Sequence, residues 1–288
     1  MTLPNFLVIG AYKSGTTALQ HALRGHPQVF IPERKGPVFF AFDGVPDDSN
    51  PAAARSVKTL EEYERLFEPA TGEPAIGDVS PEYLANPNAC GRIKARIPDA
   101  KLVAILRNPV ERAYSDYLMY VRDGQEHADF AMALDEQDVR YAAGLPTGYY
   151  VRTGFFGRQL RAYFEAFPRE QLQVHLFDDF ARDPASVLAA MFEFLGVDPE
   201  APAPAVERDN VSGIPRNAAV RTLIDTGRRL APALPGPVRR RAKGVLARGL
   251  DRPDLPAAER RRLVEIYRDD VGELEALLGR PLEHWLAG

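Results

Sequence analysis

The segment Phe6–Thr17 constrains the fold of this chain more than any other. A continuous apolar run, Phe6–Ile9, ends at Gly10, which is typical of a strand buried on both faces of a sheet. Helical periodicity begins at Thr17, and the loop between them contains a second glycine, Gly15. This strand–loop–helix pattern predicts an α/β fold in which free backbone N–H groups at the start of the helix face a ligand.

The rest of the chain alternates strand-like runs with helical patterns. Further strands are expected at residues 28–31, 75–79, 101–106 and 172–177, and helices at 110–121, 153–167, 184–195 and 257–278. Such alternation predicts a single α/β domain over residues 1–288, a three-layer, P-loop-like domain with a central parallel sheet flanked by helices. Residues 42–57 and 199–256 lack this periodicity and are expected to form irregular loops.

Composition argues against several classes of protein. The formal net charge of −4 disfavours a general nucleic-acid-binding or membrane-surface role. No apolar run approaches the ~20 residues of a membrane span, and no signal peptide is visible. The single cysteine, Cys90, excludes an intramolecular disulfide, and the histidines lack metal-ligand spacing. We expect a cytoplasmic protein without a metal, and the Ala-, Arg- and Pro-rich composition points to a bacterial gene.

The loop after the first strand carries the donors of an anion site. Lys13 supplies a positive charge, and Ser14, Thr16 and Thr17 supply hydroxyl groups beside Gly15. In a Walker A loop the lysine directly follows the second glycine, whereas here Thr16 stands in that place. The spacing therefore argues against a nucleotide or small-molecule kinase. Taken alone, the loop also fits a purely structural corner.

A second anion site is predicted after the strand at 101–106. Arg107 stands at the carboxyl end of that strand, where parallel sheets bind ligands, and its planar guanidinium suits a phosphate. Ser115 follows about two helical turns later and reaches the same anion only if the helix packs back across the site. The alternative is a surface ion pair of Arg107 with Glu111 or Asp116. A nucleotide phosphorylated at both its 5' and 3' positions needs two such sites.

Together these segments resemble the nucleotide-binding motifs of the sulfotransferases that use 3'-phosphoadenosine-5'-phosphosulfate (PAPS). Residues 6–17, FLVIGAYKSGTT, are similar to the family's 5'-phosphosulfate loop, and residues 107–117, RNPVERAYSDY, to its 3'-phosphate motif. The similarity is greatest to the heparan-sulfate-type sulfotransferase domains and their bacterial relatives. Weaker similarity occurs at GDVSPEYL, GFFGRQL, FDDF and FLGV, which begin at residues 77, 154, 177 and 194. The resemblance implies a fold related to nucleotide kinases and no metal.

The resemblance also implies roles for individual residues. Those that would bind the 5'-phosphosulfate are Lys13, Ser14, Gly15, Thr16 and Thr17. Those that would bind the 3'-phosphate are Arg107 and Ser115. A basic loop covers the nucleotide in this family, and its candidates here are Arg216, Lys243 and Arg248. The acceptor would be a hydroxyl or amine of a small molecule, lipid or carbohydrate, and 3',5'-adenosine bisphosphate would be the product.

The chain departs from the family at the general base. Relatives commonly carry a Lys-Glu-Pro-His-Phe-Phe type segment whose glutamate is the base, but here Gly36 replaces that glutamate. Another carboxylate could serve, with Asp78 first, followed by Glu33 and Asp43. Asp78 follows a strand at the predicted ligand edge, although a turn cap fits it nearly as well. Alternatively, the acceptor is acidic, as a phenol is, or the protein is a nucleotide-binding relative with weak catalysis.

Overall fold

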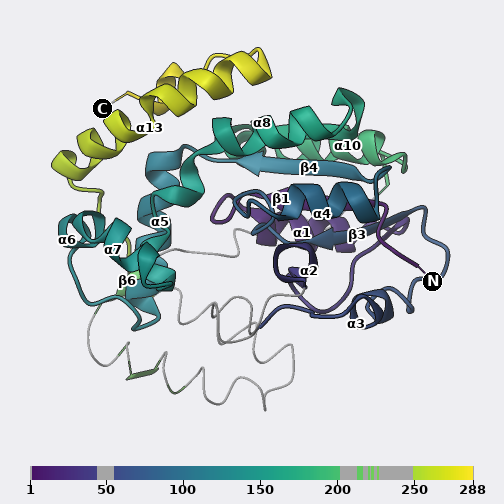
Figure 1. Cartoon of the computed structure of the whole chain (residues 1–288), viewed down its shortest axis with the longest axis horizontal. Helices are drawn as coiled ribbons and strands as arrows, with labels where there is room; N and C mark the ends of the chain where they lie inside the picture. Colours follow the sequence, from purple (N-terminus) through teal and green to yellow (C-terminus); the bar gives the residue numbers. More distant parts are fainter. Residues whose placement is uncertain are drawn as a thin grey trace.

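The computed structural model describes residues 2–43, 55–201, 213–216, 220, 222–223, 226 and 249–287. Its centre is an entirely parallel five-stranded sheet with the order β2-β3-β1-β4-β5 (Figure 1). In chain order the strands are β1 (Phe6–Gly10), β2 (Val29–Phe30), β3 (Ala75–Val79), β4 (Lys101–Leu106) and β5 (Leu172–Leu176). The predicted α/β class and central parallel sheet are confirmed.

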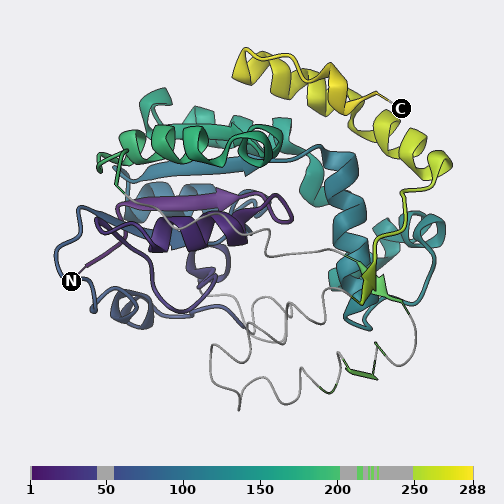
Figure 2. The ribbon, with the colours of Figure 1, turned by 180° about the vertical axis from the view of Figure 1, so that it is seen from behind.

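Helices cover both faces of the sheet (Figures 1 and 2). One face packs against α1 (Thr16–Arg24), α9 (Phe177–Arg182) and α10 (Pro184–Leu195). The other packs against α4 (Ala89–Arg96), α5 (Pro109–Arg122), α8 (Phe156–Ala166) and α13 (Ala257–Leu278). The shorter helices are α2 (Phe39–Phe42), α3 (Leu60–Arg65), α6 (Phe130–Asp135) and α7 (Gln137–Ala142).

The two central strands contribute to both cores because successive side chains point to opposite faces. In β1, Leu7 belongs to the core under α4 and α8, whereas Val8 belongs to the core under α1 and α10. In β4, Leu102 and Val103 divide in the same way. Burial on both faces explains why these strands are continuous apolar runs in the sequence.

Only parts of the two predicted irregular stretches are described. Most of residues 42–57 and 199–256 lie outside the described ranges. Within the second stretch, β6 (Ile214–Pro215) pairs antiparallel with β7 (Leu250–Asp251). Within the described ranges, no helix combines the length and apolarity that a membrane crossing requires. Those same residues contain no group of three or more His, Cys, Asp or Glu side chains arranged to hold a metal ion.

A buried carboxylate fixes the C-terminal helix α13 to the start of α8. Asp270 accepts hydrogen bonds from the backbone N–H groups of Gly157 (2.8 Å) and Arg158 (3.1 Å). A Cβ atom on Gly157 would lie 2.4 Å from the Asp270 backbone oxygen, so the helices approach each other too closely for any other residue there. Asp270 thereby satisfies two of the N–H groups that the first turn of a helix leaves unpaired.

Asp270→Asn is expected to lower the free energy of unfolding by about 1–3 kcal/mol, because the amide can accept only through one oxygen and leaves a buried donor unsatisfied. Urea denaturation measures the change. The matched control is Asp269→Asn, one residue earlier on the exposed face of α13. Equal stability of the two variants would contradict the anchoring role of Asp270.

Candidate active site

The loop between β1 and α1 lies at the carboxyl edge of the sheet, where ligands bind in parallel α/β folds. The backbone of Lys13 has a φ of 67° and that of Gly15 a φ of 90°, both in the left-handed region. Left-handed residues in such a loop gather successive N–H groups into an anion-binding concavity. Gly15 is also required sterically, because a Cβ atom there would lie 2.9 Å from Cδ2 of Phe177.

The side chains of this loop match the predicted anion site. Ser14 is fully buried, and its hydroxyl has no hydrogen-bond partner among the residues that the structure describes. A buried hydroxyl without a partner costs free energy, which a bound phosphate or sulfate oxygen would recover. The Thr17 hydroxyl accepts a hydrogen bond from Lys35 Nζ at 2.6 Å, so a second lysine adjoins the loop. Thr16, the first residue of α1, is also buried.

Lys13 is a half-buried cation with charged groups of both signs around it. Its pKa is lowered to about 8, chiefly by burial and to a smaller extent by the guanidinium groups of Arg122 and Arg107. The carboxylate of Asp116 acts in the opposite direction. The lysine is therefore mostly protonated at neutral pH and loses its proton as the pH rises through about 8, and an added negative charge would stabilise its protonated form.

Arg107 lies beside the same loop, as the sequence predicts. Its Nη1 donates to the backbone oxygen of Lys13 at 3.5 Å, and its guanidinium carbon lies 5.2 Å from the centre of the Phe177 ring. Burial lowers the pKa of Arg107 to about 10. Because Phe177 contacts both Gly15 and Arg107, one aromatic ring fixes the two predicted anion sites relative to each other.

The charges around Arg107 sum to a positive site. Glu111, on the first turn of α5, lies 3.8 Å from Arg107, but its carboxylate is also engaged by Arg260 at 2.5 Å and Arg252 at 3.4 Å. Three guanidinium groups thus share one carboxylate. Sequence reasoning missed Arg252 and Arg260, because no local pattern connects them with a helix more than a hundred residues earlier.

The other predicted donor residues have different positions. Ser115 is buried on α5, in the core-facing part of the helix. The alternative pairing of Arg107 with Asp116 does not form, because Asp116 pairs with Arg112 at 3.2 Å. Arg216 is exposed at the end of β6 and donates to Asp251 at 3.0 Å. The remaining two candidates, Lys243 and Arg248, lie outside the described residues.

The carboxylate of Asp78, the first candidate for the base, is surrounded by three hydroxyl groups that donate hydrogen bonds to it. One carboxylate oxygen accepts from Ser80 (2.7 Å) and the other from Tyr63 (2.9 Å) and Tyr83 (2.7 Å). Burial raises its pKa to about 6, against the opposing effect of these hydrogen bonds. Ser80 Oγ in turn accepts from the backbone N–H of Val38 at 3.1 Å. These contacts connect the end of β3 to the segment that carries Gly36.

Glu82 is a carboxylate that sequence reasoning missed. It lies in the turn after β3, and its Oε2 atom is buried without a hydrogen-bond partner in the described part of the chain. The sequence feature that could have indicated Glu82 as a site residue is its place within the SPEYL segment, four residues after Asp78. The other two base candidates differ in position, since Glu33 is exposed in a loop and Asp43 follows the short helix α2.

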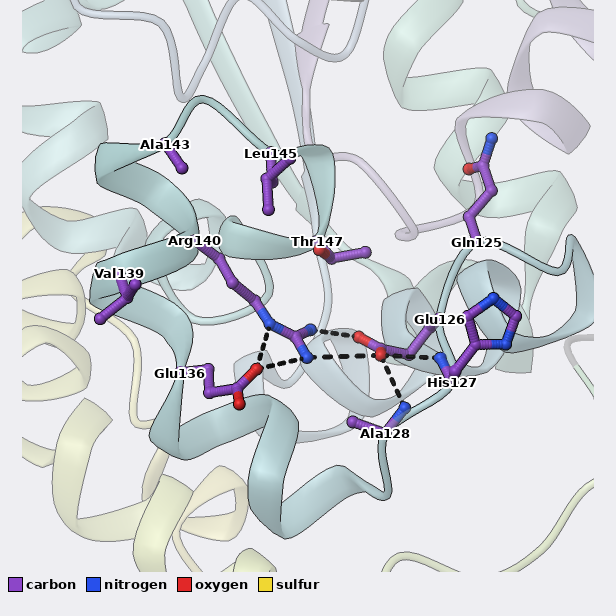
Figure 3. Close-up of a pocket in the computed structure, with 10 residues that line it drawn as sticks. All are labelled: Gln125, Glu126, His127, Ala128, Glu136, Val139, Arg140, Ala143, Leu145 and Thr147. Carbon is purple, nitrogen blue, oxygen red and sulfur yellow. Dashed lines mark hydrogen bonds and ion pairs between the residues drawn. The ribbon is translucent and has the colours of Figure 1, made fainter.

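A cavity of about 650 Å³ lies beside α7 and the segment that follows α5 (Figure 3). Its charged side chains pair with one another, since Arg140 contacts both Glu126 and Glu136. Glu126 also accepts from the backbone N–H groups of His127 and Ala128. These paired charges distinguish the cavity from the loop around Lys13, where donors are left for an anion.

Comparisons with known sequences identify the family of this chain. The profile described as "Sulfotransferase domain" matches residues 3–212. The heparan sulfate glucosamine 3-O-sulfotransferase 3B1 of Homo sapiens is 28% identical over 196 residues, which cover 68% of this chain and 46% of that protein. The bifunctional heparan sulfate N-deacetylase/N-sulfotransferase 1 of Caenorhabditis briggsae is 30% identical over 209 residues, which cover 70% of this chain and 23% of that protein. The chain therefore spans less than half the length of these curated relatives.

Solved structures show the same architecture. A sulfotransferase from Alicyclobacillus acidocaldarius superimposes with a TM-score of 0.79 at 28% identity, and the alignment covers 100% of both chains. The mouse sulfotransferase SULT7A1 complexed with PAP superimposes with a TM-score of 0.52 at 13% identity, and the alignment covers 93% of this chain and 84% of that one. At this identity the match supports the fold alone. By its sequence match over most of the chain and by its fold, this protein belongs to the sulfotransferase family.

Proposed function

We propose that this protein transfers a sulfuryl group from PAPS to a hydroxyl or amine of a small-molecule, lipid or carbohydrate acceptor. The observation that carries the proposal is the adjacency of two anion sites, the loop with Lys13 and the unpartnered Ser14 hydroxyl, and the arginine cluster around Arg107. PAPS carries negative groups at both ends of its ribose. The similarity to heparan sulfate sulfotransferases supports such a transfer.

The two sites would divide the work of binding the donor. Lys13, Ser14, Gly15, Thr16 and Thr17 would hold the 5'-phosphosulfate through side chains and backbone N–H groups. Arg107 and Ser115 would hold the 3'-phosphate, and the excess of guanidinium groups over the Glu111 carboxylate would neutralise its charge. Arg216, together with Lys243 and Arg248, remains the proposed cover of the nucleotide.

The reaction requires charge stabilisation and the transfer of one proton. The acceptor oxygen or nitrogen forms a bond to sulfur while the bond from sulfur to the bridging phosphate oxygen breaks. The electron pair of that broken bond stays on the 5'-phosphate, so negative charge grows beside Lys13 and Ser14, which would stabilise it. A base takes the acceptor proton, and 3',5'-adenosine bisphosphate leaves.

Calorimetric titration tests the nucleotide preference. We expect 3',5'-adenosine bisphosphate to bind at least about tenfold more tightly than ATP or 5'-AMP, because only the bisphosphate places a phosphate in each site, and tenfold corresponds to about 1.4 kcal/mol. Tighter binding of ATP would favour a kinase and contradict the proposal. The result does not depend on knowing the acceptor.

The pKa of Lys13 predicts how donor binding depends on pH. The protonated lysine attracts the 5'-phosphate and its pKa in the free protein is about 8, so bisphosphate affinity should fall as pH rises through that value. From pH 7 to pH 9 we expect a loss of about tenfold, as for one required proton. The phosphate itself has little effect in this range, because its second ionisation occurs near pH 6.

Two variants separate Lys13 from other causes of this pH dependence. Lys13→Ala should bind the bisphosphate weakly, with an affinity that stays constant from pH 7 to pH 9. The control Lys101→Ala removes a lysine at the amino end of β4, on the opposite edge of the sheet, and should bind as the wild type does. A tenfold fall that persists in Lys13→Ala would exclude Lys13 as its source.

A further inference from the structure

Three carboxylates near the carboxyl edge of the sheet already have partners. Glu111 is shared by three arginines, and Asp116 is buried in α5, where its Oδ2 pairs with Arg112 while its Oδ1 has no partner among the described residues. Asp78 accepts hydrogen bonds through both of its oxygen atoms and has no exposed surface. A base must be reached by the acceptor and must have a lone pair to offer, and none of these three groups meets both conditions.

Glu82 lies in a turn whose backbone is hydrogen-bonded to β1, the strand that leads into the anion loop. The N–H of Ser80 donates to Val8 at 3.1 Å, and the N–H of Leu84 donates to Ile9 at 2.8 Å. A Cβ atom on Gly10 would lie 2.6 Å from Cβ of Leu84, so the turn and the first residue of the loop are in direct contact. The backbone of Glu82, which lies between Ser80 and Leu84, is therefore held next to the start of the anion loop.

The position of Gly36 borders the same turn. A Cβ atom on Gly36 would point toward the backbone oxygen of Val79, at 3.9 Å, and toward Val38. Val79 is the last residue of β3 and directly precedes the turn with Glu82. The segment of Gly36 is bonded to that turn as well, since Val38 N–H donates to Ser80 Oγ. The turn that carries Glu82 therefore adjoins the segment in which relatives carry their glutamate.

The surroundings of Glu82 leave its carboxylate in need of a donor. The residue is partly exposed, but Oε2 is covered and has no partner among the described residues. An acceptor whose hydroxyl or amine entered beside the loop would supply the missing hydrogen bond and remove the cost of the unsatisfied oxygen.

The charged and titratable groups around Glu82 come from four elements. Burial raises the pKa of Glu82, and the negative charge of Asp78 on β3 adds to this effect. A hydrogen bond from the backbone N–H of Glu82 itself and the ammonium group of Lys35 oppose it. The tyrosines Tyr12, in the anion loop, and Tyr120, on α5, also interact electrostatically with it. A carboxylate whose pKa lies above its usual value is a stronger base.

We propose that Glu82 is the catalytic base, which accepts the proton of the acceptor hydroxyl or amine in place of the glutamate that Gly36 lacks. This inference rests on the proposed sulfuryl transfer. As the acceptor atom bonds to sulfur, its proton passes to the Glu82 carboxylate, and the bond from sulfur to the 5'-phosphate breaks. Lys35, which bonds to Thr17 and acts on Glu82, would connect donor binding with this step.

The test is a labelled-sulfate assay with PAPS and two kinds of acceptor, sugars or aliphatic amines on the one hand and an acidic nitrophenol on the other. Glu82→Gln should lower the rate on sugars and amines by about 10²–10⁴-fold, the usual contribution of a positioned base. The loss on the nitrophenol should be much smaller, because that acceptor ionises by itself. Release of labelled sulfate to water gives a third readout that needs no acceptor.

Four further measurements make the result specific. Glu82→Asp should recover part of the activity, and the exposed control Glu68→Gln should leave it unchanged. Asp78→Asn, which weakens the hydroxyl cluster, should affect sugars and nitrophenol alike. Bisphosphate affinity in Glu82→Gln should match the wild type, which shows that the variant is folded and binds the donor.

The outcomes distinguish the two proposals. Full activity of Glu82→Gln on sugars or amines, with the wild type active, would overturn the role of Glu82 and leave the sulfotransferase proposal standing. A selective loss on those acceptors in Asp78→Asn instead would assign the base to Asp78. A wild type that neither binds the bisphosphate nor releases label from PAPS would overturn the proposed function itself, and with it this inference.

Discussion

Two half-buried cations, Lys13 and Arg107, lie side by side at the carboxyl edge of the sheet. Burial lowers the pKa of both side chains, and like-charge repulsion contributes as well, from Arg122 and Arg107 on Lys13 and from Arg252 on Arg107. The fold keeps them together because Arg107 donates to the Lys13 backbone and packs on Phe177, which also covers Gly15. A bound dianion would relieve this repulsion.

The C-terminal segment helps to hold this arrangement. The side-chain amide of Asn108 donates to the backbone oxygen of Trp285 at 3.0 Å, and the Trp285 indole N–H donates to Asp178 at 2.9 Å. Asn108 and Asp178 directly follow Arg107 and Phe177, so one buried tryptophan connects the two strand ends that carry them. In the two views, α13 runs along the outer side of α8 before the chain ends near α5 (Figures 1 and 2). By anchoring α13, Asp270 therefore helps to position Trp285 and the two strand ends at the site, in addition to stabilising the fold.

The sequence predicted the features that local patterns encode. The apolar runs of β1 and β4, the glycines of the loop and the position of Arg107 all follow from neighbouring residues, and they led to the fold and to the prediction of two anion sites. The short helices α2, α3, α4, α6, α7 and α9 were missed because one or two turns carry too little periodicity. Arg252, Arg260 and Glu82 were missed because their roles depend on contacts between distant segments. The hydroxyl cluster around Asp78 likewise joins α3 to β3, which spacing cannot show.

The central claim is that Arg107 and Lys13 bind different ends of one nucleotide. The most direct measurement is calorimetric titration of Arg107→Ala with 3',5'-adenosine bisphosphate and with 5'-AMP, which lacks the 3'-phosphate. The account predicts that the bisphosphate loses most of its advantage over 5'-AMP, while 5'-AMP affinity changes little. If Arg107→Ala weakens both ligands equally, or leaves the advantage intact, Arg107 does not bind the 3'-phosphate and the two-site account is wrong.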